Sequence, residues 1–376
     1  MIYFDNAATT AVNKEILDKF VSLSQIYFAN PSSPHLLGQE TEHLLEKARK
    51  DTLRLLGVPN NKLIFTSGAT EGNNAFLKGA FLNYKNRGNK IVTSQGEHPS
   101  VRATLMQLKE LYGAEIVEIP LLENGKVDKE VLFNAIDDKT IICSLIAVNN
   151  ETGAVNDIEE IARFLKKYPK CLFHVDATQA IGKVPINYKD VDAFTFSLHK
   201  INGLKGSGCL VLKSHIELVS LLSGGKQEMT MRAGTVNLVA DLLVPDTLEL
   251  ALGNYNRNIA KIRDNHAKLM SFLQNYDEII VNSPLNGSPF IINFSLKNKK
   301  ASVIVEALAL KGISVGTTSA CSTRLGNYSH VIYAMTNDKK RSEESIRLSF
   351  CYDNTDEEVD TFIQTLQEVI SEVMYG

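Results

Sequence analysis

The chain has 376 residues, of which 44% are hydrophobic and 22% are charged, and its formal net charge is −3. This composition is typical of a soluble globular protein with one large and one smaller domain, or with two medium ones. The weak net charge does not favour a nucleic acid or a membrane surface as a direct partner. No apolar run is long enough to cross a bilayer. The first residues, "MIYFDNAATT", lack the features of a signal peptide, so we expect a cytoplasmic protein.

Strand-like runs alternate with helical patterns through roughly the first two-thirds of the chain. We predict strands at 62–67, 89–94, 140–148, 170–177, 192–198 and 207–212, and helices at 68–85, 98–113 and 156–168. Continuous apolar strands separated by amphipathic helices indicate a mostly parallel central sheet with helices on both faces. The sequence therefore predicts an α/β fold.

The pattern changes past about residue 245. A long helical stretch at 246–276 is followed by a strand at 289–296, a helix at 302–311, a strand at 345–350 and a last helix from 356 on. This order predicts a second, smaller α+β domain.

The number of cysteines is odd, and none of them shows the CxxC or Cys/His spacing of a metal site. The five are Cys143, Cys171, Cys209, Cys321 and Cys351. We therefore expect no metal site. Four of them lie in or at the end of apolar strands, which predicts buried structural thiols. Cys321 differs, because it lies in the small and polar stretch "GTTSACSTRLGNYS".

The segment that follows the predicted strand at 62–67 is suited to binding an anion. "IFTSGATEGNN" is strand, glycine turn and helix, so Gly68 allows the turn and the first helical N–H groups point at open space. The Thr70 hydroxyl could add a donor to a phosphate bound there. The alternative is an ordinary helix cap.

Two further strand ends carry charged residues. Asp176 ends the strand in "CLFHVDATQA", where its carboxylate either caps a helix, joins an ion pair or holds a protonated ring nitrogen. Lys200 follows the next strand in "SLHKINGLKG", where partial burial lowers the pKa of an amine and makes it a nucleophile towards aldehydes. Ser197 and His199 beside it could contact a phosphate. Ligands bind beyond the carboxyl ends of parallel strands, and an anion site, an acid and an amine there suit pyridoxal 5′-phosphate (PLP).

The whole chain resembles one family of PLP enzymes. "YFDNAATT", "NPSSPH", "TSGATEGNN", "EHPSV", "VNNETG", "HVDATQ", "SLHKINGLKG", "MRAGT", "SACS" and "SIRLSF" occur in the order and with the spacing of that family. The chain therefore resembles the class V, fold-type I PLP enzymes, and specifically the cysteine desulfurases of the NifS/IscS kind.

The resemblance implies roles around the cofactor ring. Lys200 would hold the PLP aldehyde as a Schiff base and later move protons. His98 would stack on the ring and serve as acid or base. Asp176 would pair with the pyridinium nitrogen, and Gln179 would hydrogen-bond the ring hydroxyl.

It also implies a phosphate site that is shared between two subunits. Ala69, Thr70, Ser197 and His199 would hold the phosphate from one subunit. Thr235, in "MRAGT", would reach the phosphate of the other subunit, so the resemblance implies a homodimer.

The substrate and the reaction follow from the same resemblance. Arg347 and Asn150 would hold the carboxylate of L-cysteine, and Asn150 would also border the cofactor. The Cys321 thiolate would attack the substrate sulfur, leaving alanine and a persulfide for an acceptor protein. The length of the loop after Cys321 resembles the IscS-like group, which delivers sulfur to an iron–sulfur scaffold or to a tRNA-thiolating enzyme.

The resemblance also implies the division of the chain. Residues 15–250 would form the large PLP domain, and residues 1–14 with 251–376 the small domain that carries Cys321 and Arg347. The active site would lie between them.

Six residues depart from the pattern of the family without removing a cofactor contact: Lys226, Thr230, Val236, Thr318, Tyr328 and Cys351.

Three other functions stay open at this point. They are a class V aminotransferase, a selenocysteine lyase, against which the longer loop argues, and a sulfur carrier that does not bind PLP.

Overall fold

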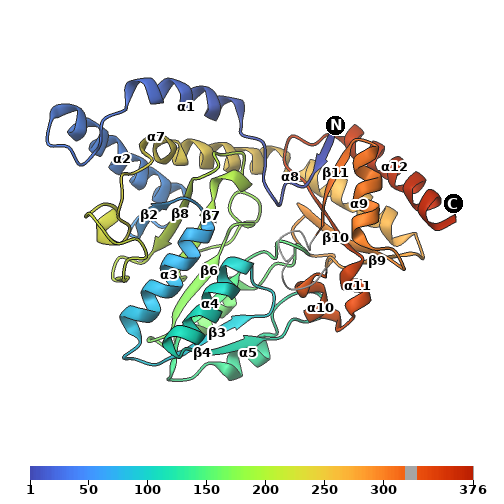
Figure 1. The fold of residues 1–376 in the computed structure, drawn as a ribbon, viewed down its shortest axis with the longest axis horizontal. Coiled ribbons are helices and arrows are strands. Elements are labelled where there is room, and N and C mark those ends of the chain that lie inside the picture. The colour runs from blue at the N-terminus through green and yellow to red at the C-terminus, as the bar shows by residue number, and fades with distance from the viewer. Residues whose placement is uncertain (318–327, 376) are drawn as a thin grey trace.

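The computed structural model describes residues 1–317 and 328–375, and two β-sheets organise them (Figure 1). The larger sheet has seven strands in the order β2-β8-β7-β6-β5-β3-β4. Its strands are β2 (Lys62–Thr66), β3 (Lys90–Ser94), β4 (Glu115–Ile119), β5 (Thr140–Ile146), β6 (Leu172–Asp176), β7 (Ala193–Ser197) and β8 (Gly208–Leu212). Neighbours from β7 to β4 are parallel, and β8 is antiparallel to β7 and β2. The predicted mostly parallel sheet is confirmed.

Both faces of this sheet are buried except at its edge strand β4, because neighbouring residues of a strand enter different cores. Leu63 and Phe65 belong to one apolar cluster, whereas Ile64 between them belongs to another. Helices α3 (Ala69–Tyr84) and α4 (Pro99–Tyr112) supply the second cluster. The first receives side chains of α2 (Leu36–Leu55), α5 (Lys129–Ala135), α6 (Ile158–Leu165) and α8 (Val244–Gln274). This arrangement explains why the strands read as continuous apolar runs.

The smaller sheet has five strands in the order β1-β11-β12-β10-β9 and a core of its own. Its strands are β1 (Ile2–Phe4), β9 (Ile279–Val281), β10 (Ile291–Leu296), β11 (Ile313–Thr317) and β12 (Ser345–Ser349). Helices α9 (Ala301–Leu310) and α12 (Asp356–Tyr375) contribute to its core, and α10 (His330–Thr336) and α11 (Lys339–Glu343) precede β12. Helix α8 contacts α2 at one end of the molecule and β9, β10 and α12 at the other (Figure 1).

The remaining elements connect the two sheets or cover the larger one. They are α1 (Lys14–Ile26), α7 (Leu238–Leu242), and the short 3₁₀ turns η1 (Leu198–Lys200) and η2 (Glu228–Thr230). The division at about residue 250 falls inside α8, and the domain boundaries stay a prediction. Among the described residues, no helix is long and apolar enough to span a membrane.

Two expectations from the sequence need correction. The helix predicted at 156–168 is shorter, because α6 ends at Leu165 and a turn towards Pro169 follows. Cys143, Cys171 and Cys209 are buried as predicted, but Cys351 is only half-buried. The prediction was wrong there because β12 ends at Ser349, so that Cys351 lies in the turn after the strand. Cys321 and Thr318 lie outside the described residues.

Candidate active site

Four of the predicted site residues meet at one edge of the larger sheet. His98 caps α4 directly after β3, Asn150 follows β5, Asp176 is the last residue of β6, and Lys200 ends η1 after β7. These strands are parallel, so their carboxyl ends lie along the same edge, where ligands bind in open α/β sheets.

Neutral donors hold the carboxylate of Asp176. Its Oδ2 atom accepts a hydrogen bond from Asn73 Nδ2 at 2.9 Å, and Oδ1 accepts one from the Thr178 N–H at 3.0 Å. Asn73 is itself fixed, since its carbonyl oxygen accepts the Thr195 hydroxyl and its NH₂ group also donates to Ser100. No cation pairs with Asp176 within the described ranges. Its buried negative charge is therefore oriented and available to a protonated ring nitrogen.

The turn before α3 is packed against β8. The Ala69 N–H donates to the Ser197 hydroxyl at 2.7 Å. A Cβ atom added to Gly208 would lie 2.4 Å from the Cα atom of Gly68, so only glycine lets the strand approach the turn this closely. Thr70 is exposed in the first turn of the helix. The start of α3 and the Ser197 hydroxyl thus lie together, and their role towards a phosphate stays a prediction.

Two histidines at this edge of the sheet, His98 and His199, have lowered pKa values. His98 Nδ1 accepts a hydrogen bond from the Ser100 N–H at 3.1 Å, which leaves the proton on Nε2. Burial lowers the pKa of His98, and the charges of Lys200 and Arg347 add to this, although Asp176 acts in the opposite direction. Burial and then Lys200 lower the pKa of His199 to about 4.

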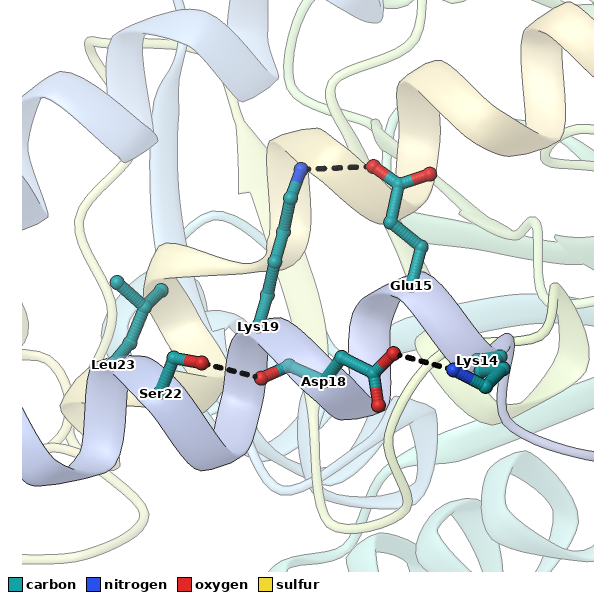
Figure 2. A pocket seen from close by; sticks show the side chains of 6 residues that line it. All are labelled: Lys14, Glu15, Asp18, Lys19, Ser22 and Leu23. Carbon is teal, nitrogen blue, oxygen red and sulfur yellow. Dashed lines mark hydrogen bonds and ion pairs between the residues drawn. The ribbon is translucent and has the colours of Figure 1, made fainter.

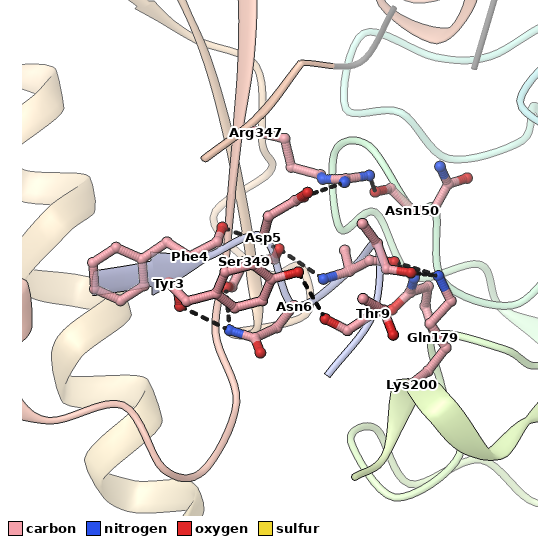
Figure 3. Close-up of polar contacts among 12 residues, drawn as sticks. Tyr3, Phe4, Asp5, Asn6, Thr9, Asn150, Gln179, Lys200, Arg347 and Ser349 are labelled. Atoms are coloured by element: carbon pink, nitrogen blue, oxygen red, sulfur yellow. Dashed lines mark hydrogen bonds and ion pairs between the residues drawn. The ribbon is translucent and has the colours of Figure 1, made fainter. Parts of the chain in front are cut away.

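The N-terminal segment joins the lysine to the smaller sheet (Figure 3). Lys200 Nζ donates to the carbonyl oxygens of Ala7 and Ala8, both at 2.6 Å. Gln179 Nε2 donates to the same Ala7 oxygen at 2.9 Å, and the Ala7 N–H donates to the Ser349 hydroxyl at 2.8 Å. The residues after β1 therefore connect the lysine and Gln179 to β12.

Arg347 reaches from β12 towards the larger sheet (Figure 3). It is only 8% exposed, its Nη2 donates to Asp5 Oδ1 at 2.7 Å, and its Nη1 donates to the Asn150 carbonyl oxygen at 3.0 Å. Its buried Nε has no hydrogen-bond partner in the described part of the chain. The structure thus brings together the two residues predicted to hold a substrate carboxylate.

Several contacts of this site were missed by the sequence reasoning. "YFDNAATT" and "TSGATEGNN" were noted as motifs, but no role was given to Asp5 or Asn73. A polar residue on the buried face of a helix is the signal that could have identified Asn73. Glu151, next to Asn150, was also missed: it accepts a hydrogen bond from Ser329, the N-cap of α10, and burial raises its pKa to about 7.

Two further predicted residues have no contact with this group that the structure describes. Thr235 is exposed and lines a separate cavity of about 170 Å³ together with Ser67 and Asp241, and its predicted contact with a second subunit stays a prediction. Cys321 lies outside the described residues. A further hollow runs along α1 (Figure 2). It is lined by exposed ion pairs of Lys14 and Lys19 with acids of the same helix and by none of the predicted site residues.

Comparison with known proteins identifies the class first. The model of the family described as aminotransferase class-V matches residues 2–362, so the chain belongs to this family. The chain is 36% identical over 374 residues to a NifS/IcsS protein homolog of Lactobacillus delbrueckii subsp. bulgaricus, covering 98% of this chain and 97% of that protein. It is 32% identical over 376 residues to the cysteine desulfurase IscS of Dictyoglomus turgidum, covering 99% and 95%.

Solved structures agree with this assignment. A NifS-like protein superposes with a TM-score of 0.92 at 33% identity, with 99% of each chain covered. A NifS-like protein from Rickettsia africae superposes with a TM-score of 0.87 at 29% identity, again with 99% of each chain covered. Within the aminotransferase class-V family, this chain is a member of the NifS/IscS group.

Proposed function

We propose that the chain is a PLP-dependent cysteine desulfurase, which converts L-cysteine to L-alanine and keeps the sulfur as a persulfide on Cys321. The observation that carries this proposal is the meeting of Lys200, Asp176 and His98 at one sheet edge, opposite Arg347 of the smaller sheet. The membership in the NifS/IscS group supports it.

The residues present fit PLP. The buried carboxylate of Asp176 has no cationic partner in the described ranges, as a ligand with a protonated ring nitrogen requires. His98 would stack on the ring, Gln179 would bind its hydroxyl, and Lys200 would hold its aldehyde. The phosphate would lie beside Ala69 at the start of α3. It would accept from Thr70, Ser197 and His199, and from Thr235 of a second subunit. When bound, PLP supplies an electron sink for the charge that develops on the substrate Cα.

The residues of the chain bind the substrate and move its protons. Arg347 and Asn150 hold the carboxylate of L-cysteine, and Asp5 keeps the guanidinium of Arg347 in place. Lys200 would take the Cα proton of the bound substrate. His98, whose lowered pKa keeps its ring neutral, serves as a base towards the substrate.

Cys321 carries the sulfur. Its thiolate attacks the substrate sulfur, so that an S–S bond forms while the C–S bond breaks and leaves its electron pair on the carbon. A proton added to that carbon and the return of a proton to Cα then complete L-alanine. L-cysteine and one enzyme thiol thus give L-alanine and one enzyme persulfide, with no oxidant or reductant required. The persulfide then passes to an acceptor protein, namely an iron–sulfur scaffold or a tRNA-thiolating enzyme, in the cytoplasm.

Substitution of Cys321 tests this function. Cys321→Ser should bind PLP as the unchanged protein does but form no persulfide and no alanine from L-cysteine. Cys351→Ser is the matched control, because it removes a half-buried thiol that has no part in the transfer. Unchanged release of alanine and sulfide by Cys321→Ser would refute the role of this thiol.

Three further measurements distinguish the other functions. Alanine formation by an aminotransferase would require an added keto acid, and a selenocysteine lyase would act faster on selenocysteine than on L-cysteine. A carrier that does not bind PLP would show no PLP absorbance.

A further inference from the structure

A second lysine lies buried beside Lys200. Lys183 is 5% exposed, and its side chain and that of Lys200 line the same narrow cavity of about 10 Å³, together with Ala251, Cys351 and Tyr352. Such a space holds one water molecule at most. Burial, and then the charge of Lys200, lower the pKa of Lys183 to about 7.

The polar partner of Lys183 is a neutral amide. Its Nζ donates to the Oε1 atom of Gln179 at 3.2 Å, and no carboxylate of the described ranges lies within ion-pair distance. Burying an amine without a counter-charge is unfavourable compared with burying an apolar side chain of the same size. Lys183 therefore does not serve the stability of the fold, and its contact with Gln179 points to another role.

This contact and one other fix the orientation of the Gln179 amide. The Ala7 carbonyl oxygen can only accept, so the Gln179 NH₂ group must face it, at 2.9 Å. The carbonyl oxygen of the amide then faces the opposite way, towards the donor on Lys183. Because Lys200 donates to the same Ala7 oxygen, a continuous set of hydrogen bonds links Lys183, Gln179, Ala7 and Lys200.

We propose that Lys183 is a positioning residue of the cofactor site, which holds the Gln179 carbonyl oxygen so that the amide NH₂ group faces the ring hydroxyl of PLP. This inference rests on the PLP site of the proposed function. Of the two protons on that NH₂ group, one goes to Ala7 and the other serves the cofactor. Without Lys183, only the hydrogen bond to Ala7 opposes a rotation of the amide, and that rotation would turn its oxygen towards the ring oxygen, where two acceptors would repel each other.

Charged and titratable groups face Lys183 from η1, from β12, from the turn after β12 and from α8, which lines a second cavity with it. Lys200 belongs to η1, Arg347 to β12, and Cys351 and Tyr352 to the turn after β12. The Tyr352 hydroxyl donates to the Gly182 carbonyl oxygen at 2.9 Å. Tyr352→Phe is therefore a matched control, because it removes a hydrogen bond in the same cavity but none to Gln179.

The test measures PLP binding and thermal unfolding, with no desulfurase assay. PLP is titrated into the full-length, cofactor-free protein and followed by absorbance, for the unchanged chain and for Lys183→Met. We expect Lys183→Met to weaken PLP binding about tenfold, as the loss of one oriented hydrogen bond implies. The cofactor-free variant should melt at a higher temperature than the unchanged protein, because a buried amine has been replaced by an apolar side chain of similar length. Tyr352→Phe should bind PLP within about twofold of the unchanged protein.

A double-variant cycle decides whether Lys183 acts through Gln179. In a Gln179→Ala background, Lys183→Met should cause no further loss of PLP affinity. The same tenfold loss in both backgrounds would overturn the proposal, as would a Lys183→Met protein that melts lower and binds PLP normally. Lys183→Gln, which keeps a neutral donor, replaces Lys183→Met if the latter does not fold, and its affinity should then fall by less than tenfold. A protein that binds PLP as described but releases no alanine would refute the proposed function and leave this inference standing.

Discussion

The hydrogen bonds of Asp176 allow one prediction to be worked out in detail. Asp176→Asn replaces one of two accepting oxygens by an NH₂ group. Both oxygens are in use, one by Asn73 Nδ2 and one by the Thr178 N–H, so the substitution sets one donor against another. Asn73 can turn its amide only if the hydroxyls of Thr195 and Ser100 also exchange their hydrogen bonds.

The expected loss of stability follows from this conflict. One buried hydrogen bond to a charged group is lost and one donor is left without an acceptor, which costs about 2 kcal/mol. For a chain of this size, that lowers the melting temperature of the cofactor-free protein by about 2–4 °C. Thermal unfolding of the cofactor-free variant, followed by circular dichroism, measures this change in melting temperature. The PLP affinity should fall as well, because the ring nitrogen loses its counter-charge.

A compensating substitution separates the two effects. Asn73→Asp in the Asp176→Asn background moves the carboxylate to α3, where it accepts from the new amide and from the Thr195 hydroxyl. The double variant should melt close to the unchanged protein and still bind PLP weakly. If Asp176→Asn melts like the unchanged protein, or if the double variant is no more stable than the single one, the reasoning is refuted.

Two other substitutions test buried parts of the fold. Burial, and then Glu228, raise the pKa of Asp241 to about 8, so the folded protein keeps this proton while the unfolded chain loses it near pH 4. The stability due to this proton is complete below pH 4 and is lost as the pH rises to 8. Asp241→Asn should therefore raise the free energy of unfolding at pH 8, on the order of 3 kcal/mol, and with it the melting temperature. The gain should be much smaller at pH 5, and a gain that does not depend on pH would contradict this reasoning. Gly208→Ala should lower the free energy of unfolding by about 3 kcal/mol and remove most of the PLP affinity, because its Cβ atom would lie 2.4 Å from the Gly68 Cα atom. Unfolding and PLP titration curves like those of the unchanged protein would count against this close contact.

The larger sheet could be predicted from the sequence because its signals are local. Both faces of β5 and β6 are buried, so these strands read as apolar runs, and the amphipathic helix α6 lies between them in the chain. The edge strand β4 was not predicted, because only Ile119 of its five residues is buried. The ends of β6 and β7 could be predicted in the same way, because Asp176 is a charged residue at the end of an apolar strand and Lys200 is one three residues past such an end.

The polar contacts of the site join residues that are far apart in the chain, and the sequence alone did not predict which residues contact one another. Asp5 and Arg347 are separated by 342 positions, and Lys200 and Ala7 by 193. The local sequence pattern indicates neither pair, because hydrogen bonds between two elements depend on where the fold places those elements. Lys183 reads as an ordinary lysine near a proline, and only packing against Lys200 and Gln179 shows that it is buried. The sequence determined which elements form and which strand ends carry chemistry, whereas the tertiary structure decided which side chains hold one another in place, because those contacts form only when both sheets have packed together.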